Sequence, residues 1–191
     1  MNKAWKEILS TAVYLLAVLV VTYLIVAFVG QRTTVEGSSM EPTLIGSSET
    51  EPDKVGDQLI VDKISYRFKD PERFDIIVFP FKYNDQYYIK RIIGLPGETI
   101  KIENGQIYIK TRDTDWEVLR EGFGKEVITD PGRAAEPVTL GEDEYFVLGD
   151  NRNNSADSRS EVVGNIKRED IVGKAWVRIW PLSRFGKLEH R

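Results

Sequence analysis

The chain has 191 residues, of which 41% are hydrophobic, and a formal net charge of −4. This composition is typical of a folded domain, and no stretch interleaves basic and aromatic residues as a nucleic-acid surface would, so we expect no nucleic-acid partner. The chain has no cysteine, which excludes a thiol nucleophile, a disulfide and a thiolate metal site. The only histidine, His190, lies on an expected frayed tail, so a Ser-His-Asp triad is not expected.

Residues 8–30 form an uncharged segment rich in Leu, Val, Ile and Ala. A helix of roughly 20 such residues crosses a hydrocarbon core of about 30 Å, whereas a cleaved signal peptide has an apolar region of roughly 7–15 residues. We therefore predict one transmembrane signal anchor rather than a buried core helix. Lys3 and Lys6 precede the segment and Arg32 follows it, a slight bias that favours a cytoplasmic tail at 1–7 and an extracytoplasmic domain at 31–191.

The rest of the chain predicts a mainly β domain. Short β-branched runs separated by turn residues occur at 58–61, 75–79, 87–93, 98–102, 106–109, 144–148 and 171–179. Asn104-Gly105, between two alternating segments, indicates a hairpin. The polar segment 111–140 leaves the main sheet without a recognisable fold of its own, so we predict a small lobe or long loops over about 103–142.

Three motifs carry candidate chemistry. The first, VEGSSMEPTL at 35–44, follows the predicted span. Taken alone, it would be an ordinary Ser-containing loop. It is not the G-x-S-x-G nucleophile elbow of other serine hydrolases, because Glu41 occupies the position of the last glycine. The second is YYIKRIIGLPG at 87–97, where strand alternation puts Lys90 between Tyr88 and Ile92 on one face. Lys90 is either an edge-strand lysine that limits aggregation or a buried lysine whose pKa falls from about 10.4 toward neutrality, as a general base requires.

A third motif, GDNRNNSADSR at 149–159, follows an apolar strand. Its short polar residues are typical of tight turns, and a Ca²⁺ loop is the other alternative. Arg152 interrupts the carboxylates and the terminal bidentate Glu of an EF-hand is missing, so we expect no metal.

Together with the strand RFDIIVF at 73–79, these motifs resemble the boxes of the type I signal peptidase family, in the family's order, from the anchor to about Arg159. The lysine at position 90 matches the bacterial members of the family, because eukaryotic-type members carry His at this position. The resemblance implies a membrane-bound serine endopeptidase that removes signal peptides after small residues of A-x-A type, with no cofactor. It also implies an antiparallel, β-barrel-like catalytic domain, shared with self-cleaving repressors, with a small inserted β lobe.

The same resemblance implies a role for individual residues. Ser39, rather than Ser38, would be the nucleophile and Lys90 the general base, and a hydrogen bond between Ser155 and Lys90 would orient the lysine. Asp157 and Arg159 would form a charged pair that supports the site.

Further roles follow from the family pattern. Asp150 and Arg152 would fix the third motif, and the Ser39 N–H would be an oxyanion donor. Some family members carry a hydroxyl residue as second donor where this chain has Gly37. The substrate pocket would be formed by Val35, Met40, Tyr88 and Ile89.

The expected partners are secretory preproteins emerging from the translocation machinery and the lipid bilayer of a bacterial cell, and we expect a single-pass monomer. Trp176 and Trp180 could meet the lipid interface, although we expect them to pack in the core. Two alternatives are a self-cleaving regulatory Ser-Lys protease and a non-enzymatic, membrane-tethered β-domain. The anchor and the lack of a DNA-binding N-terminal domain argue against the first, and three coincidental motifs would be needed for the second.

Overall fold

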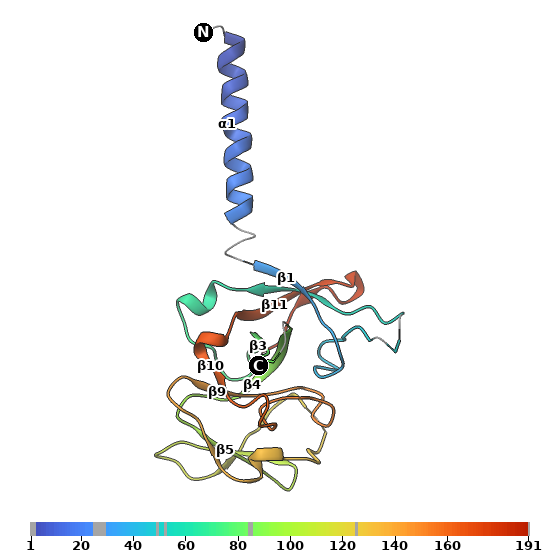
Figure 1. Cartoon of the computed structure of the whole chain (residues 1–191), viewed down its shortest axis with the longest axis vertical. Coiled ribbons are helices and arrows are strands. Elements are labelled where there is room, and N and C mark those ends of the chain that lie inside the picture. Colours follow the sequence, from blue (N-terminus) through green and yellow to red (C-terminus); the bar gives the residue numbers. More distant parts are fainter. Residues whose placement is uncertain are drawn as a thin grey trace.

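The computed structural model describes residues 3–24, 30–48, 50–51, 53–83, 86–124 and 126–190. One long helix stands on a β domain that contains two antiparallel sheets (Figure 1). The helix and strands are α1 (Lys3–Leu24), β1 (Gly30–Thr34), β2 (Gln58–Asp62), β3 (Ile76–Pro80), β4 (Tyr87–Gly94), β5 (Thr99–Glu103), β6 (Gln106–Lys110), β7 (Glu117–Val118), β8 (Val138–Thr139), β9 (Glu144–Leu148), β10 (Ile166–Lys167), β11 (Gly173–Trp180) and β12 (Gly186–Lys187). Short 3₁₀ turns are η2 (Ser65–Arg67), η3 (Gly132–Ala135), η4 (Arg168–Asp170) and η5 (Leu182–Arg184).

Helix α1 is long and apolar enough over Lys3–Tyr23 to cross a membrane, and none of this window is buried against the β domain. It begins earlier than the predicted span at 8–30, because nothing before Ile8 breaks a helix. Gly30, the predicted last residue of the span, instead lies in β1 and pairs with Asp62. Residues 25–29 lie outside the described part of the chain.

The larger sheet has the strand order β1-β2-β11-β3-β4-β9-β10, with β12 paired to β11. The described strand pairs are all antiparallel, which confirms the predicted mainly β fold with an N-terminal apolar helix. The seven strands expected from alternating apolar residues all form, each within about two residues of its predicted bounds.

The second sheet has the order β7-β6-β5-β8 and lies between β4 and β9 in the chain. The hairpin predicted at Asn104-Gly105 joins β5 to β6: both residues have positive φ, 52° and 74°, as a type I′ turn requires. Because β5 begins at Thr99, this sheet starts before the predicted lobe at 103–142. Much of the polar 111–140 segment lacks regular structure, and its strands β7 and β8 have two residues each.

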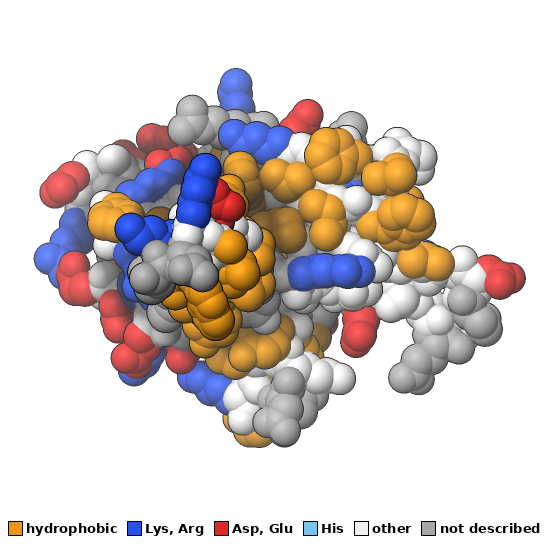
Figure 2. Space-filling view, turned by 90° about the horizontal axis from the view of Figure 1, so that it is seen from above, with side chains coloured by type: hydrophobic (Ala, Val, Ile, Leu, Met, Phe, Trp, Pro, Cys, Tyr) orange, Lys and Arg blue, Asp and Glu red, His pale blue; other side chains and the backbone are white. Residues whose placement is uncertain are grey.

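Figure 2 looks down on the face from which α1 rises, and hydrophobic side chains gather there. Trp176 and Trp180 of β11 are 47% and 44% exposed, so the expectation that they pack in the core is wrong. Nearby in the chain, Leu182 and Phe185 are also exposed.

An apolar cluster aligns the two segments that carry the candidate dyad. Val35 and Met40, from the first motif, are buried in one cluster with Ile89 of β4 and Val78 of β3. Burying side chains of this size stabilises the fold by about 1.5–3 kcal/mol each. The residues beside Met40 and Ile89 are Ser39 and Lys90, so the core holds these two face to face.

Candidate active site

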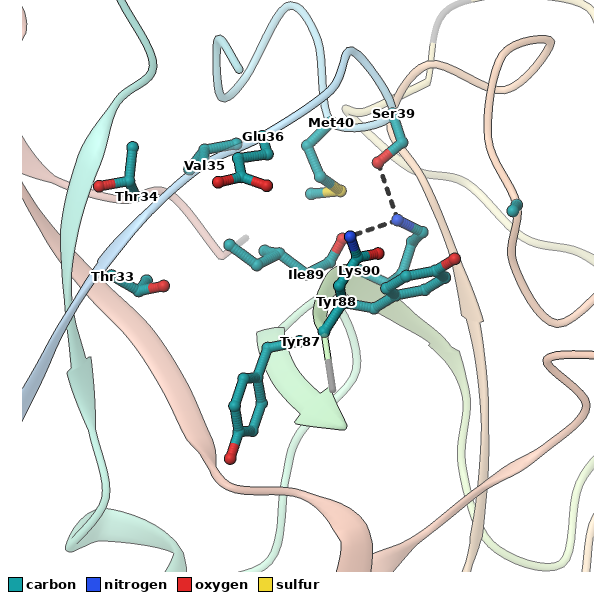
Figure 3. A pocket seen from close by; sticks show the side chains of 12 residues that line it. Thr33, Thr34, Val35, Glu36, Ser39, Met40, Tyr87, Tyr88, Ile89 and Lys90 are labelled. Atoms are coloured by element: carbon teal, nitrogen blue, oxygen red, sulfur yellow. Dashed lines mark hydrogen bonds between the residues drawn. The ribbon is translucent and has the colours of Figure 1, made fainter. Parts of the chain in front are cut away.

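Ser39 and Lys90 lie 51 residues apart in the sequence and meet in the structure. The Lys90 Nζ is 2.8 Å from the Ser39 Oγ, to which it donates a hydrogen bond (Figure 3). Ser39 lies on the turn after β1, whereas Lys90 lies in β4. A serine hydroxyl in hydrogen-bond reach of an amine has the geometry that nucleophile activation requires.

The Lys90 side chain is almost completely buried, with an exposed fraction of 4%. Its Nζ also donates to the Ile89 carbonyl oxygen at 3.1 Å and lies 5.0 Å from the centre of the Tyr88 ring. Burial lowers the pKa of Lys90 from 10.5 to about 8, although Asp157 and Asp150 oppose the shift. A substantial fraction of this lysine is therefore neutral in mildly alkaline solution and can accept a proton.

The turn that carries Ser39 is held by the third motif. Asn151 donates from its backbone N–H to the Ser39 carbonyl at 3.0 Å and from its amide to the Ser38 carbonyl at 3.1 Å. The Asn154 amide donates to the Ser38 Oγ at 2.8 Å. Gly37 has a φ of 72°, a left-handed conformation that disfavours a side chain there. The backbone at position 37 therefore favours the glycine found there over a residue with a side chain.

Asp157 and Arg159 form the ion pair expected of them. The two side chains are in bidentate contact at 2.8 and 2.9 Å, and both are buried. Asp157 also accepts a hydrogen bond from the Gly149 N–H at 3.1 Å, while Arg159 donates to the Arg152 carbonyl at 2.6 Å. The pair therefore holds the turn next to Ser39.

Ser155 does not make the hydrogen bond to Lys90 that the family pattern implies. Within the described chain its buried Oγ has no hydrogen-bond partner. It packs against Gly149, where an added Cβ would lie 2.3 Å from this Oγ and 2.4 Å from the Ser39 carbonyl oxygen. Ser155 lines a separate cavity of about 170 Å³. Its orienting role remains a prediction.

Asp150 and Arg152 each bind residues outside the third motif rather than each other. The Asp150 carboxylate accepts two hydrogen bonds from Arg91, at 2.8 and 2.7 Å, and one from the Thr43 hydroxyl at 2.5 Å. Arg152 pairs with Glu121 at 2.6 Å. Burial raises the pKa of Glu121, and Arg152 opposes that shift.

The sequence alone does not indicate a role for Arg91, Asn151 or Asn154. Arg91 is fully buried beside Lys90 and also donates to the Phe74 carbonyl at 2.8 Å. The clue to Arg91 is a second charged residue, next to Lys90, in a strand whose other residues are mostly apolar. For Asn151 and Asn154 the sequence offers no clue except that both lie in a polar turn.

A cavity of about 440 Å³ opens beside the dyad. The four predicted substrate-binding residues, Val35, Met40, Tyr88 and Ile89, all line it (Figure 3). The sequence did not indicate the other lining residues, which are Thr33, Thr34, Glu36, Gln86, Tyr87 and Ala156.

His190 is not on a frayed tail as expected. Its Nδ1 accepts a hydrogen bond from the Ile76 N–H at 3.1 Å, and its side chain is 8% exposed. Burial lowers the pKa of His190 to about 4, with Lys174 acting in the same direction. No three His, Cys, Asp or Glu side chains of the described chain are grouped as a metal site.

A family model described as "Signal peptidase, peptidase S26" matches residues 6–180. The chain is 37% identical over 193 residues to a probable signal peptidase I-2 of Synechocystis sp., covering 98% of this chain and 78% of that protein. It is 33% identical to a signal peptidase I P of Bacillus subtilis subsp. natto, covering 89% of this chain and 88% of the relative.

Among solved structures, a signal peptidase I from Enterococcus faecalis V583 is 37% identical to the chain, with a TM-score of 0.45. That match covers 56% of this chain and 97% of the other. The family match spans most of the sequence and includes both residues of the dyad. The chain therefore belongs to the signal peptidase I family of S26 serine peptidases, which cleave signal peptides.

Proposed function

We propose that Ser39 is the nucleophile and Lys90 the general base with which this chain cleaves secretory preproteins after small residues. The observation that carries the proposal is the 2.8 Å contact between the Lys90 Nζ and the Ser39 Oγ, made by an amine that burial biases toward its neutral form. Both residues line the same cavity, so a substrate carbonyl has access to them.

Lys90 accepts and returns the proton in both steps of the proposed reaction. Neutral Lys90 accepts the Ser39 hydroxyl proton while the Ser39 Oγ attacks the carbonyl carbon of the scissile peptide bond. The tetrahedral intermediate collapses, the new amino terminus leaves with the proton from Lys90, and the signal peptide remains as a Ser39 ester. Water then loses a proton to Lys90 and attacks the ester, and the proton returns to Ser39 as the acid product leaves.

The Ser39 N–H donates no backbone hydrogen bond within the described chain, which supports an oxyanion role. A backbone donor already aimed at a developing oxyanion stabilises the transition state by about 3–4 kcal/mol. Gly37 contributes no side-chain donor.

Two strand edges support binding of an extended substrate. The β1 strand pairs with β2 alone, and the described ladder between β4 and β9 begins only at Arg91, which leaves one edge of residues 87–90 without a strand partner in the described chain. An extended peptide can add to such edges through backbone hydrogen bonds. Its small side chains would meet the apolar wall formed by Val35, Met40, Tyr88 and Ile89.

The helix supports the proposed location. We place α1 across a bacterial cell membrane as a single-pass anchor, with its N-terminal end, which carries Lys3 and Lys6, facing the cytoplasm and the β domain outside, where preproteins leave the translocation machinery. The exposed Trp176 and Trp180 suit a lipid interface.

The chain would work as a monomer, since the dyad and cavity come from one copy. A self-cleaving repressor would have no need for the apolar helix.

A cleavage assay of the full chain in detergent tests this function. The purified protein is incubated with a preprotein bearing an A-x-A exit, and the new amino terminus is identified by mass spectrometry. We expect Ser39→Ala and Lys90→Ala to abolish cleavage, while Ser38→Ala, the matched control, retains it at a reduced rate. Cleavage by either dyad variant at the wild-type rate contradicts the assignment.

A further inference from the structure

The substrate cavity is lined by one carboxylate, Glu36, among the described residues. Glu36 follows Val35 in the segment that leaves β1, and Figure 3 shows its carboxylate directed from this segment toward the cavity, near Val35 and Met40. Thr33 and Thr34 line the cavity on the same side. Lys90, at the dyad, is the only described basic residue in the lining.

The Glu36 side chain is exposed, and within the described chain it forms no ion pair. The next acidic residue in the motif, Glu41, differs, because Lys54 pairs with it at 2.7 Å. An unpaired carboxylate at the rim of a binding cavity attracts a cation without the large desolvation penalty of a buried charge. The structure leaves this charge available to the substrate.

We infer that Glu36 is a specificity-determining residue that selects a basic side chain on the substrate, an inference that rests on the proposed function. Successive side chains of an extended strand point to opposite sides. A substrate strand lying along this segment that puts a small residue against Val35 therefore brings the adjacent residue to Glu36. Glu36 selects lysine or arginine at the residue between the two small ones of the A-x-A pattern.

The size of the effect follows from the exposure of the pair. Partly solvated ion pairs are modest in strength, so a lysine at this position raises kcat/KM about two- to fivefold over glutamine. Salt screens such a pair over about 10 Å at 0.1 M ionic strength, so the preference declines as salt is added.

The test uses the full chain in detergent and a set of preprotein peptides that share one A-x-A exit. Lysine, glutamine or glutamate is placed at the middle residue of the A-x-A exit. In separate peptides it is placed at the residue directly before or directly after this exit. The quantity compared within each protein is the ratio of kcat/KM for lysine over glutamine. The proteins are wild type, Glu36→Gln, Glu36→Lys and, as matched control, Glu117→Gln on β7 of the second sheet.

The expected ratio in wild type and in Glu117→Gln is about two to five at the middle residue and near one elsewhere. We expect Glu36→Gln to bring this ratio to about one. In Glu36→Lys the ratio should fall below one, and kcat/KM for the glutamate peptide should exceed that for the glutamine peptide. A ratio near one in wild type, or a lysine preference that persists in Glu36→Gln, overturns the inference while cleavage itself continues. Failure of wild type to cleave the glutamine peptide overturns the proposed function as well.

Discussion

Arg91 and Asp150 form a bidentate ion pair at 2.8 and 2.7 Å, and neither side chain is more than 1% exposed. The pair joins β4, at the residue beside Lys90, to the third motif, which carries Asn151 on the Ser39 turn. It thus connects the strand of the base to the loop that holds the nucleophile. Its strength affects both stability and activity.

Asp150→Asn leaves the Arg91 guanidinium buried without a countercharge. Removing one partner of a buried pair costs about 3–5 kcal/mol, so we expect the free energy of unfolding to fall by about that amount. Denaturant titration of the full chain in detergent measures it, and the cleavage rate should fall with it. Glu142→Gln is the control, because Glu142 and Arg112 are 3.8 Å apart and 89% and 87% exposed. Equal losses in the two variants contradict this account.

Lys90→Met should stabilise the protein while abolishing cleavage. Burial lowers the pKa of Lys90 from 10.5 to about 8. That difference corresponds to about 3 kcal/mol, a destabilisation fully present below pH 8 and relieved as pH rises toward 10.5.

We therefore expect Lys90→Met to be about 1–3 kcal/mol more stable than wild type at pH 7, with the gain shrinking by pH 10. Unfolding titrations of both proteins at the two pH values measure the difference. A gain that does not change with pH would show that burial of the charge is not its source.

The hydrogen bond between Asn154 and Ser38 predicts a positioning role for both. Asn154→Ala and Ser38→Ala should each lower kcat about two- to tenfold with little change in KM, since each loses a bond worth about 0.5–1.5 kcal/mol. The double variant should be no slower than the slower single variant, because the same bond is removed. Cleavage kinetics of the four proteins complete the cycle, and fully additive losses would mean that the two residues act separately.

The sequence predicted the parts of the fold that rest on local patterns. Alternating apolar residues located the strands, and Asn104-Gly105 located a hairpin because both residues tolerate positive φ. The sequence does not indicate β1, because this strand is polar, adjoins the apolar run at Gly30 and forms only by pairing with β2. The two-residue strands β7 and β8 carry no periodic pattern.

The candidate site was predictable in its residues but not in its connections. Alternation suggested that Lys90 is buried, and the family pattern paired it with Ser39, yet only packing brings them within 2.8 Å. The spacing of nearby residues does not indicate pairs that are distant in the sequence, such as Arg91 with Asp150. His190 shows the same limit, because its place at the chain end hid a contact with Ile76.

The central claim is that Lys90 activates Ser39. It is tested most directly by the rate at which an activated ester acylates Ser39 in the full chain, followed by mass spectrometry from pH 6 to pH 10. We expect the rate to rise with pH through about 8, as Lys90 loses its proton, and to be near zero at all pH values in Lys90→Ala. Ser39→Ala should not be labelled at this site. A rate independent of pH, or equal acylation of wild type and Lys90→Ala, would contradict the claim.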